Sequence, residues 1–276
     1  MRVSGRNARF QQWEALLRNR AKRQRRGEFL VQGVRPIAMA VEHDWEVREL
    51  LYDAEAQMSG WARKVLDTVR AETFAVSREL MHELGGKADT VPELLAVVAS
   101  RADDLSRIPA GPTMNVVVFD RPTSPGNIGT LVRSADALGA SGVIVTGHAA
   151  DVYDPKAVRA STGSLFALPV VRVPAYQAVL SWVADVRAAG VGIGVVGTDE
   201  HGALDVAEYD FTRPTLTLIG NETTGLSVGW RAACDQLVRI PMSGAASSLN
   251  AAAAGTVVLY ESARQRRAAP VAPRQR

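Results

Sequence analysis

The second half of the chain alternates short apolar runs with helical stretches, and this pattern restricts the fold more than any other feature. A strand candidate, Val-Val-Val-Phe, covers residues 116–119, and others cover residues 143–145, 170–173, 191–196, 216–219 and 237–240. Helical stretches lie among them at residues 130–138, 178–188 and 249–264. Such alternation is typical of a parallel sheet covered on both faces. We therefore expect a mostly parallel α/β domain over residues 113–264.

The first hundred residues predict a smaller α/β domain. Residues 7–26 have apolar side chains spaced for one buried helix face, at Phe10, Trp13, Leu16 and Leu17. Strand candidates follow at residues 29–31, 47–52, 73–76 and 94–99, and they alternate with helical stretches at 36–41, at 61–69 and after Ser77. Residues 1–100 form this expected domain. Residues 101–112 lose the periodicity and form the expected linker.

Basic residues gather at both ends of the chain, although its formal net charge is only +3. Residues 1–35 contain ten basic and two acidic side chains, and residues 264–276 contain five basic and none acidic. Basic segments suit a polyanion, because contacts to phosphates release condensed counterions. We expect the C-terminal residues 265–276 to be only a flexible, solubilising tail. From the N-terminal segment we expect RNA contacts by Arg18, Arg20, Lys22, Arg23, Arg25, Arg26 and Arg35.

Several functional classes lack the residues that they need. The single cysteine, Cys234, cannot form an internal disulfide, and the chain shows neither a secretory signal nor about 18 consecutive apolar residues. We expect a cytoplasmic protein without membrane contact. The histidines are scattered, so no metal is expected: His43, His82, His148 and His201. Asp151 and Asp154 could be paired carboxylates, but Asp-Pro at 154–155 is ordinary turn chemistry, and no GxSxG hydrolase motif is present.

Residues 192–197 match GxGxxG, the pattern of a dinucleotide-binding loop. In such a loop the glycines follow a strand and begin a helix. Here they lie within a β-branched run, and a turn at residues 198–202 follows. We interpret this segment as a glycine-rich strand.

Three polar, glycine-containing segments follow strand candidates of the second domain. Their sequences are PGNIGTLVR at 125–133, GNETTGL at 220–226 and IPMSGAASSLN at 240–250. Ligands of open α/β sheets bind beyond the carboxyl ends of the strands. Each segment alone also has an ordinary explanation, because Asn and Gly form turns and Ser247 or Ser248 could cap the last helix. Together they predict one composite site built from three loops.

In this order and spacing, the three segments resemble the motifs NxGxxxR, GxExxG and IPMxGxxxSLN of the SpoU/TrmH RNA 2′-O-ribose methyltransferases. The resemblance covers residues 113–264. Residues 25–33, RRGEFLVQG, look like the N-terminal substrate-binding domain of this family, which is related to ribosomal protein L30e. The chain as a whole is most similar to the avilamycin-resistance 23S rRNA methyltransferase branch of the family in actinomycetes. One departure is Ala251-Ala252 after Ser-Leu-Asn, where many relatives have Val-Ser.

The resemblance implies a SPOUT catalytic domain with a C-terminal trefoil knot, a rare exception to the rule that chains do not thread loops. It also implies S-adenosylmethionine (SAM) as the cofactor, with its adenine held mainly by backbone groups. The cofactor-binding candidates are Gly220, Asn221, Gly225, Ile240, Met242, Leu249 and Asn250. The catalytic candidates are Arg133, Asn127, Glu222, Ser248 and Asn250.

Methylation of a ribose hydroxyl requires the oxygen to lose its proton as it attacks the methyl group. An arginine pKa above about 12 makes Arg133 a poor general base. We therefore assign Arg133 to orienting the ribose and stabilising the developing alkoxide, while phosphate, water or a hydroxyl accepts the proton.

The expected function is 2′-O-methylation of RNA, at a uridine or another nucleotide of 23S rRNA, with antibiotic resistance and housekeeping both open as purposes. The alternatives are a tRNA 2′-O-methyltransferase and a noncatalytic RNA- or ribosome-binding protein. The family resemblance also implies an obligate homodimer. The small residues 251–255 of the last helix permit close backbone approach at its interface. We expect Arg133 to serve the cofactor site of the partner subunit.

Overall fold

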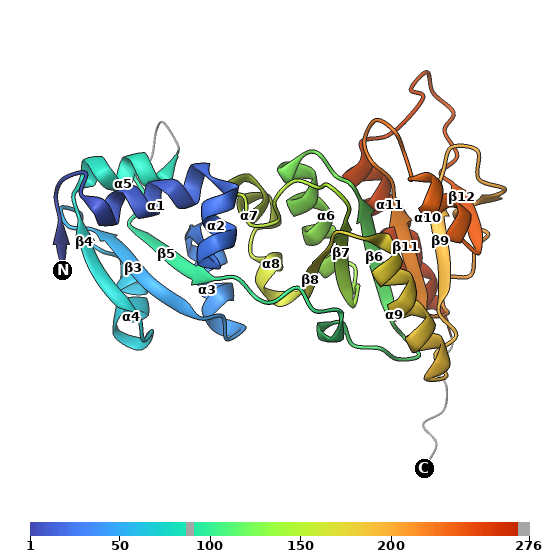
Figure 1. Cartoon of the computed structure of the whole chain (residues 1–276), viewed down its shortest axis with the longest axis horizontal. Helices are drawn as coiled ribbons and strands as arrows, with labels where there is room; N and C mark the ends of the chain where they lie inside the picture. The colour runs from blue at the N-terminus through green and yellow to red at the C-terminus, as the bar shows by residue number, and fades with distance from the viewer. Residues whose placement is uncertain (87–90, 270–276) are drawn as a thin grey trace, which may run out of the picture. The chain divides into compact units, whose positions relative to one another are not determined.

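The computed structural model describes residues 1–86 and 91–269, and the chain divides into two compact units (Figure 1). One unit contains Met1–Ala102 and Asp151–Ala167, and the other contains Asp103–Ala150 and Leu168–Arg276. Both units combine helices with a β-sheet, as the sequence predicts. None of the helices in the described part of the chain has the length and apolar character that a membrane span requires.

The first unit contains a five-stranded sheet in the order β1-β4-β3-β5-β2. The strands are β1 (Arg2–Val3), β2 (Glu28–Gln32), β3 (Val47–Asp53), β4 (Glu72–Val76) and β5 (Leu94–Ala99). Strand β5 is antiparallel to both β2 and β3, and the other pairs are parallel. The four strands predicted in this part of the sequence are confirmed. The helices are α1 (Ala8–Arg18), α2 (Arg20–Arg26), α3 (Val34–Glu42), α4 (Gly60–Thr68) and α5 (Arg78–Gly85).

The helix expected over residues 7–26 is two helices, because Asn19 interrupts it. The backbone of Asn19 is extended, and its side chain accepts a hydrogen bond from the amide of Lys22. Asn19 therefore ends α1 and caps α2, as asparagine does when it competes with the helical backbone. The apolar face of α1 is buried as predicted, through Phe10, Trp13 and Leu16.

The segment Asp151–Ala167 packs in the first unit, although we expected residues 113–264 to form one uninterrupted domain. It contains α7 (Pro155–Ser161) and α8 (Ser164–Ala167), which the sequence analysis did not predict. Phe29 stacks on Tyr153 with 4.5 Å between ring centroids, and Trp45 donates a hydrogen bond to the carbonyl of Phe166. These aromatic contacts hold the segment in the first unit, although the residues before and after it in the sequence belong to the second unit.

The second unit contains a seven-stranded sheet in the order β10-β12-β9-β11-β6-β7-β8, and all its pairs are parallel. The strands are β6 (Asn115–Asp120), β7 (Gly142–Thr146), β8 (Val170–Val173), β9 (Gly194–Thr198), β10 (Leu204–Asp205), β11 (Thr215–Ile219) and β12 (Gln236–Arg239). The helices are α6 (Pro125–Ala137), α9 (Tyr176–Ala188), α10 (Val228–Ala233) and α11 (Ala251–Ala268), with a 3-10 turn at Leu105–Arg107. The parallel α/β prediction is confirmed.

Three boundaries in this unit differ from our expectations. The glycine-rich strand is confirmed, but it begins at Gly194 rather than at residue 191. The expected linker packs in the second unit from Asp103 on, where Ile108 is buried. The basic tail expected from residue 265 is helical through Ala268, because Arg266 donates hydrogen bonds to the carbonyls of Thr113 and Arg213. Residues 270–276 of that tail lie outside the described residues.

Helix α11 lies against α6 and β11 (Figure 1). A Cβ atom on Gly255 would lie 2.5 Å from Cδ1 of Leu131, so glycine lets the two helices approach closely here without displacing the leucine. One residue further along α11, the hydroxyls of Thr256 and Ser134 lie 2.7 Å apart and form a hydrogen bond. The packing of α11 on α6 brings the last motif next to the first.

Candidate functional site

A cleft of about 520 Å³ lies in the second unit, at the edge of the sheet where the parallel strands end. Its lining comes from the residues that follow β9, β11 and β12 and from the start of α11. The volume is within the range of small-molecule sites. Six of the seven expected cofactor-binding residues line it: Gly220, Asn221, Gly225, Ile240, Met242 and Leu249.

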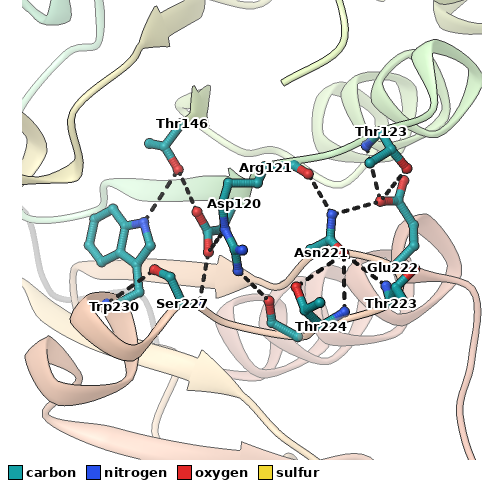
Figure 2. A network of polar contacts seen from close by, with 11 residues as sticks. Asp120, Arg121, Thr123, Thr146, Asn221, Glu222, Thr223, Thr224, Ser227 and Trp230 are labelled. Carbon is teal, nitrogen blue, oxygen red and sulfur yellow. Dashed lines mark hydrogen bonds and ion pairs between the residues drawn. The ribbon is translucent and has the colours of Figure 1, made fainter. Parts of the chain in front are cut away.

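The segment 220–225 lines one wall of the cleft. Figure 2 shows the polar contacts of Asn221, Glu222, Thr223 and Thr224 in this segment. The backbones of Asn221 and Gly225 pair in both directions, and Oδ1 of Asn221 accepts hydrogen bonds from the amides of Thr223 and Thr224. Gly225 has a φ of +63°, which glycine adopts without strain. A Cβ atom on Gly220 would lie 2.5 Å from the carbonyl carbon of Gly225. The loop is therefore closed on itself and exposes its backbone groups to the cleft.

A chain of hydrogen bonds connects the three motifs through Glu222, Asn127 and Asn250. Nδ2 of Asn127 donates to Oε1 of Glu222 at 2.9 Å, and Nδ2 of Asn250 donates to Oδ1 of Asn127 at 3.2 Å. The amide and hydroxyl of Thr123 both donate to Oε2 of Glu222 at 3.1 Å. The structure thus brings together three of the five expected catalytic residues.

The carboxyl group of Glu222 is an acceptor of these hydrogen bonds. Burial raises its pKa, but the hydrogen bonds from Asn127 and Thr123 outweigh that effect and lower the pKa below its ordinary value. Glu222 is therefore ionised at neutral pH, and its oxygens are occupied by donors. This arrangement fits a residue that positions Asn127 better than one that accepts a proton.

The first motif is helical, whereas we expected a loop before residue 130. Helix α6 begins at Pro125, and the hydroxyl of Ser124 accepts a hydrogen bond from the amide of Asn127. Proline fits the first helical position, where its missing N–H has no helical partner. Asn127 therefore occupies the first turn of α6.

Arg133 lies apart from the hydrogen-bonded chain. It comes six residues after Asn127 on α6, which places it about 240° further round the helix. Its side chain is exposed, and within residues 1–86 and 91–269 no hydrogen bond or ion pair to it is formed. The structure does not bring Arg133 to Glu222 or Asn250 of the same chain.

Residues 241–250 of the third motif are all exposed. Ser248 lines the cleft, and so do Met242 and Leu249, which are 41% and 42% exposed despite being apolar. Oδ1 of Asn250 caps α11 by accepting hydrogen bonds from the amides of Ala252 and Ala253. The motif therefore contributes a helix cap and an apolar surface open to a ligand.

The sequence analysis missed three charged residues of the cleft, Asp199, Glu200 and Arg231. Asp199 directly follows β9, its side chain is only 7% exposed, and it forms an ion pair with Arg231 of α10. The position of Asp199 after a strand of the same sheet is a signal that could have identified it.

The basic candidates of the first unit have different environments. Arg18, Arg20, Lys22 and Arg25 are exposed on α1 and α2, as expected. Arg26 pairs with Glu28, and Arg35 donates a hydrogen bond to the carbonyl of Thr162.

The assignment of Arg23 to RNA binding is wrong, because its side chain is 4% exposed. Its Nε lies 2.8 Å from Oδ2 of Asp151, and its NH1 donates to the carbonyls of Leu16 and Leu17. Asp154 lies 3.5 Å from NH2. Asp151 thus forms a buried ion pair with Arg23. We expected Asp-Pro at 154–155 to form a turn, but Asp154 caps α7 and Pro155 begins that helix.

Comparisons with known proteins place this geometry in one family. Residues 7–96 match the SpoU L30e-like domain, and residues 114–260 match the SpoU rRNA Methylase family. A relative from Streptomyces viridochromogenes, the 23S rRNA (uridine(2479)-2′-O)-methyltransferase, is 63% identical over 96% of this chain and 92% of its own length.

Two solved structures extend the comparison. The SpoU methyltransferase AviRb from Streptomyces viridochromogenes, in complex with the cofactor AdoMet (SAM), is 63% identical, with a TM-score of 0.93 over 96% of this chain and 100% of that chain. The AdoMet-bound rRNA methyltransferase from Sinorhizobium meliloti is 30% identical, with a TM-score of 0.84 over 96% of this chain and 97% of that chain. The motifs, the fold and these similarities together show that the chain belongs to the SpoU rRNA methylase family.

Proposed function

We propose that the chain transfers a methyl group from SAM to the ribose 2′-hydroxyl of a nucleotide in 23S rRNA, with uridine as the favoured base. The observation that carries this proposal is the hydrogen-bonded chain of Glu222, Asn127 and Asn250 beside the cleft. It joins all three family motifs in one site. The relative that is 63% identical is named for the same reaction on 23S rRNA.

The cleft fits SAM by its size and by the groups that line it. The backbone of residues 220–225 offers hydrogen-bonding groups, and Ile240, Met242 and Leu249 offer an apolar surface suited to adenine. The bound cofactor supplies an electrophilic methyl group on a sulfonium. The loop 220–225 and the side chain of Glu222 line the same cleft, and their contacts are formed within the protein alone.

We assign Arg133 to the ribose that is methylated, where its guanidinium would orient the 2′-oxygen and stabilise the developing negative charge. Arg133 lies on a different side of α6 from Asn127 and takes no part in the hydrogen-bonded chain of its own subunit, so we propose that it acts in the cleft of a partner subunit. The proton would pass to phosphate, water or a hydroxyl, because Glu222 is occupied by donors.

A homodimer is the second part of the proposal. Helices α6 and α11 pack together, and α11 leaves Val257 38% and Tyr260 55% exposed. An apolar stripe on a helix that carries part of the site fits a second copy of the same chain, which would also supply Arg133. The trefoil knot stays a prediction of the family resemblance.

A complementation experiment tests the shared site. Arg133→Ala and Asn250→Ala chains, each inactive alone, are co-expressed with different tags, and the heterodimer is isolated. One of its two clefts would contain both Asn250 and an intact Arg133, so part of the wild-type rate should return. A heterodimer that forms and stays inactive would place the whole site in one chain, and a wild-type monomer at micromolar concentration would refute the assembly.

The first unit would bind RNA through the exposed basic side chains of α1 and α2, which suits phosphate contacts. We also propose that the enzyme acts in the cytoplasm, where it would meet a ribosomal RNA substrate. Antibiotic resistance and housekeeping modification are the two purposes that such a methylation could serve.

Mapping of ribose methyl groups tests the substrate. The chain is expressed in a host that lacks it, and 2′-O-methyl groups are located on ribosomal and transfer RNA, beside Arg133→Ala as the inactive control. A new methyl group on 23S rRNA that is absent with Arg133→Ala is the expected result. A new group on tRNA alone would favour the tRNA enzyme, and no new group together with no SAM binding would favour a noncatalytic RNA-binding protein. Growth on a ribosome-targeting antibiotic separates the two purposes.

A further inference from the structure

Arg121 follows β6 directly and lies outside the three family motifs. Strands β6 and β11 are neighbours, and Phe119 pairs with Ile219. Two residues further along each strand, Arg121 and Asn221 therefore emerge side by side. Arg121 has a φ of +52°, in the left-handed region that non-glycine residues seldom adopt. Such a conformation persists where surrounding contacts hold it in place.

Arg121 contacts both ends of the loop 220–225 (Figure 2). Its carbonyl accepts a hydrogen bond of 2.6 Å from Nδ2 of Asn221. Its guanidinium donates through NH2 to the carbonyl of Gly225 at 3.0 Å. Asn221 and Gly225 are the two residues whose backbones pair to close the loop. One residue outside the loop thus holds both residues that define its shape.

The side chain of Arg121 is itself held by its neighbours. Its Nε donates to Oδ2 of Asp120 at 3.1 Å, and Asp120 is 2% exposed. The same carboxylate accepts hydrogen bonds from the amide of Ser227 and the hydroxyl of Thr146. A Cβ atom on Gly147 would lie 2.5 Å from Cγ of Arg121, so only glycine leaves room for the arginine stem. The guanidinium is therefore fixed before any ligand binds.

We propose that Arg121 is a positioning residue for the cofactor, because it holds the loop 220–225 in the shape that binds SAM. This inference rests on the proposed function for the identity of the ligand. The role is indirect, since Arg121 acts through the loop. Fixing a loop in its bound conformation increases affinity by removing the cost of ordering it on binding.

Arg187 offers a matched control. Like Arg121, it donates to a carboxylate, that of Asp235, and to a backbone carbonyl, that of Ile193. The two side chains are comparably exposed, at 33% for Arg121 and 44% for Arg187. Neither arginine lines the cleft, and the two differ in their partners: Arg121 donates to Gly225 of the loop, whereas Arg187 donates to Ile193 and Asp235. Replacing either residue by alanine removes the same chemical groups, and only Arg121→Ala should affect the loop.

The experiment measures SAM affinity by calorimetry, KM for SAM and kcat with RNA, and amide hydrogen exchange of residues 220–226 without cofactor. We expect Arg121→Ala to raise Kd and KM for SAM about tenfold, to leave kcat at saturating SAM within about threefold, and to speed exchange in the loop. Arg187→Ala should match the wild type. Arg121→Gly, which adopts a positive φ without strain and keeps the carbonyl contact, should lose the same affinity and serves if Arg121→Ala does not fold.

Wild-type affinity in folded Arg121→Ala, an equal loss in Arg187→Ala, or lost affinity without faster exchange in the loop would each overturn the positioning role. A wild-type protein that binds no SAM would refute the proposed function instead. In that case, the exchange comparison alone still decides whether Arg121 holds the loop.

Discussion

Arg23 and Asp151 form a buried ion pair in the first unit, and breaking this pair should destabilise the unit. Both side chains are 4% exposed, and the amide of Tyr153 also donates to Oδ1 of Asp151. Arg23→Met keeps most of the length of the side chain but leaves the Asp151 carboxylate buried without its cation. Breaking a buried pair in this way typically costs about 3–5 kcal/mol. The loss is a large part of the roughly 5–15 kcal/mol that stabilises a typical domain.

A double-mutant cycle separates the ion pair from simple loss of packing. Asp151→Asn keeps a carbonyl oxygen for the amide of Tyr153, and Arg23→Met with Asp151→Asn removes both charges together. We expect the double variant to be more stable than Arg23→Met alone, with a coupling free energy of about 1–3 kcal/mol. Because the chain has two units, the assay is native-state hydrogen exchange of the slowest amides in β2 and β5, which reports the unfolding of the first unit alone.

Two results would refute this reasoning. A folded Arg23→Met variant whose first unit is within about 1 kcal/mol of the wild type would show that the Asp151 carboxylate does not depend on the Arg23 cation. The second result concerns RNA binding. If Arg23→Met is stable and the slope of log RNA affinity against log salt concentration falls by about one, Arg23 would be a phosphate contact after all.

Three further predictions concern the charge of Glu222, the RNA contacts of α2 and the packing of α11 against α6. Glu222→Gln should destabilise the second unit by about 1–3 kcal/mol at pH 7. The amide nitrogen of the glutamine would face donors that the carboxylate oxygens now accept, so hydrogen bonds would be lost. Since folding lowers the Glu222 pKa, the deficit measured by chemical unfolding should shrink as pH falls below the ordinary value of 4.5. Lys22→Ala with Arg25→Ala should weaken RNA binding and flatten its salt dependence without loss of stability; an unchanged slope would argue against phosphate contacts. Gly255→Ala should cost about 1–3 kcal/mol, because its methyl would strike Leu131, and an unchanged unfolding midpoint would refute that packing.

The sheet of the second unit was predictable because its strands are buried and β-branched. The run at residues 116–119 is fully buried within β6, and the run at 216–219 lies within β11. Such strands produce continuous apolar runs in the sequence. The start of α6 was missed because Gly126 and Gly129 weaken the helical pattern, although Ser124-Pro125 is the usual cap and first residue of a helix.

The role of Arg23 could not be predicted, because its partner lies 128 residues away in the sequence. The periodicity contained a partial signal, since Arg23 follows Leu16 by seven residues and so lies on the apolar side of a continuous helix. Composition pointed the other way, because Arg23 is surrounded by exposed basic residues. A local pattern assigns a face to a residue, while an ion pair depends on which segment packs against that face.

Positions 251–252 are Ala-Ala, where many relatives have Val-Ser. Ala252 is 1% exposed, so a serine there would need a buried hydrogen-bond partner. One turn later, Thr256 donates to the carbonyl of Ala252 and shares a hydrogen bond with Ser134 of α6. Thr256 thus makes a polar contact between α11 and α6, in addition to that of the cap residue Asn250 with Asn127, and position 252 is left to close packing.

The composite site depends on the parallel register more than on any single motif. Asn127 and Glu222 are 95 residues apart, and Asn127 and Asn250 are 123 apart. Phe119 pairs with Ile219, so the segments that follow β6 and β11 begin side by side, and α11 returns the third segment to α6. A shift of this register by one residue would separate Arg121 from Asn221, and the loop 220–225 would lose the contacts that hold it. The strands therefore determine the geometry of the site, and the motif residues complete it.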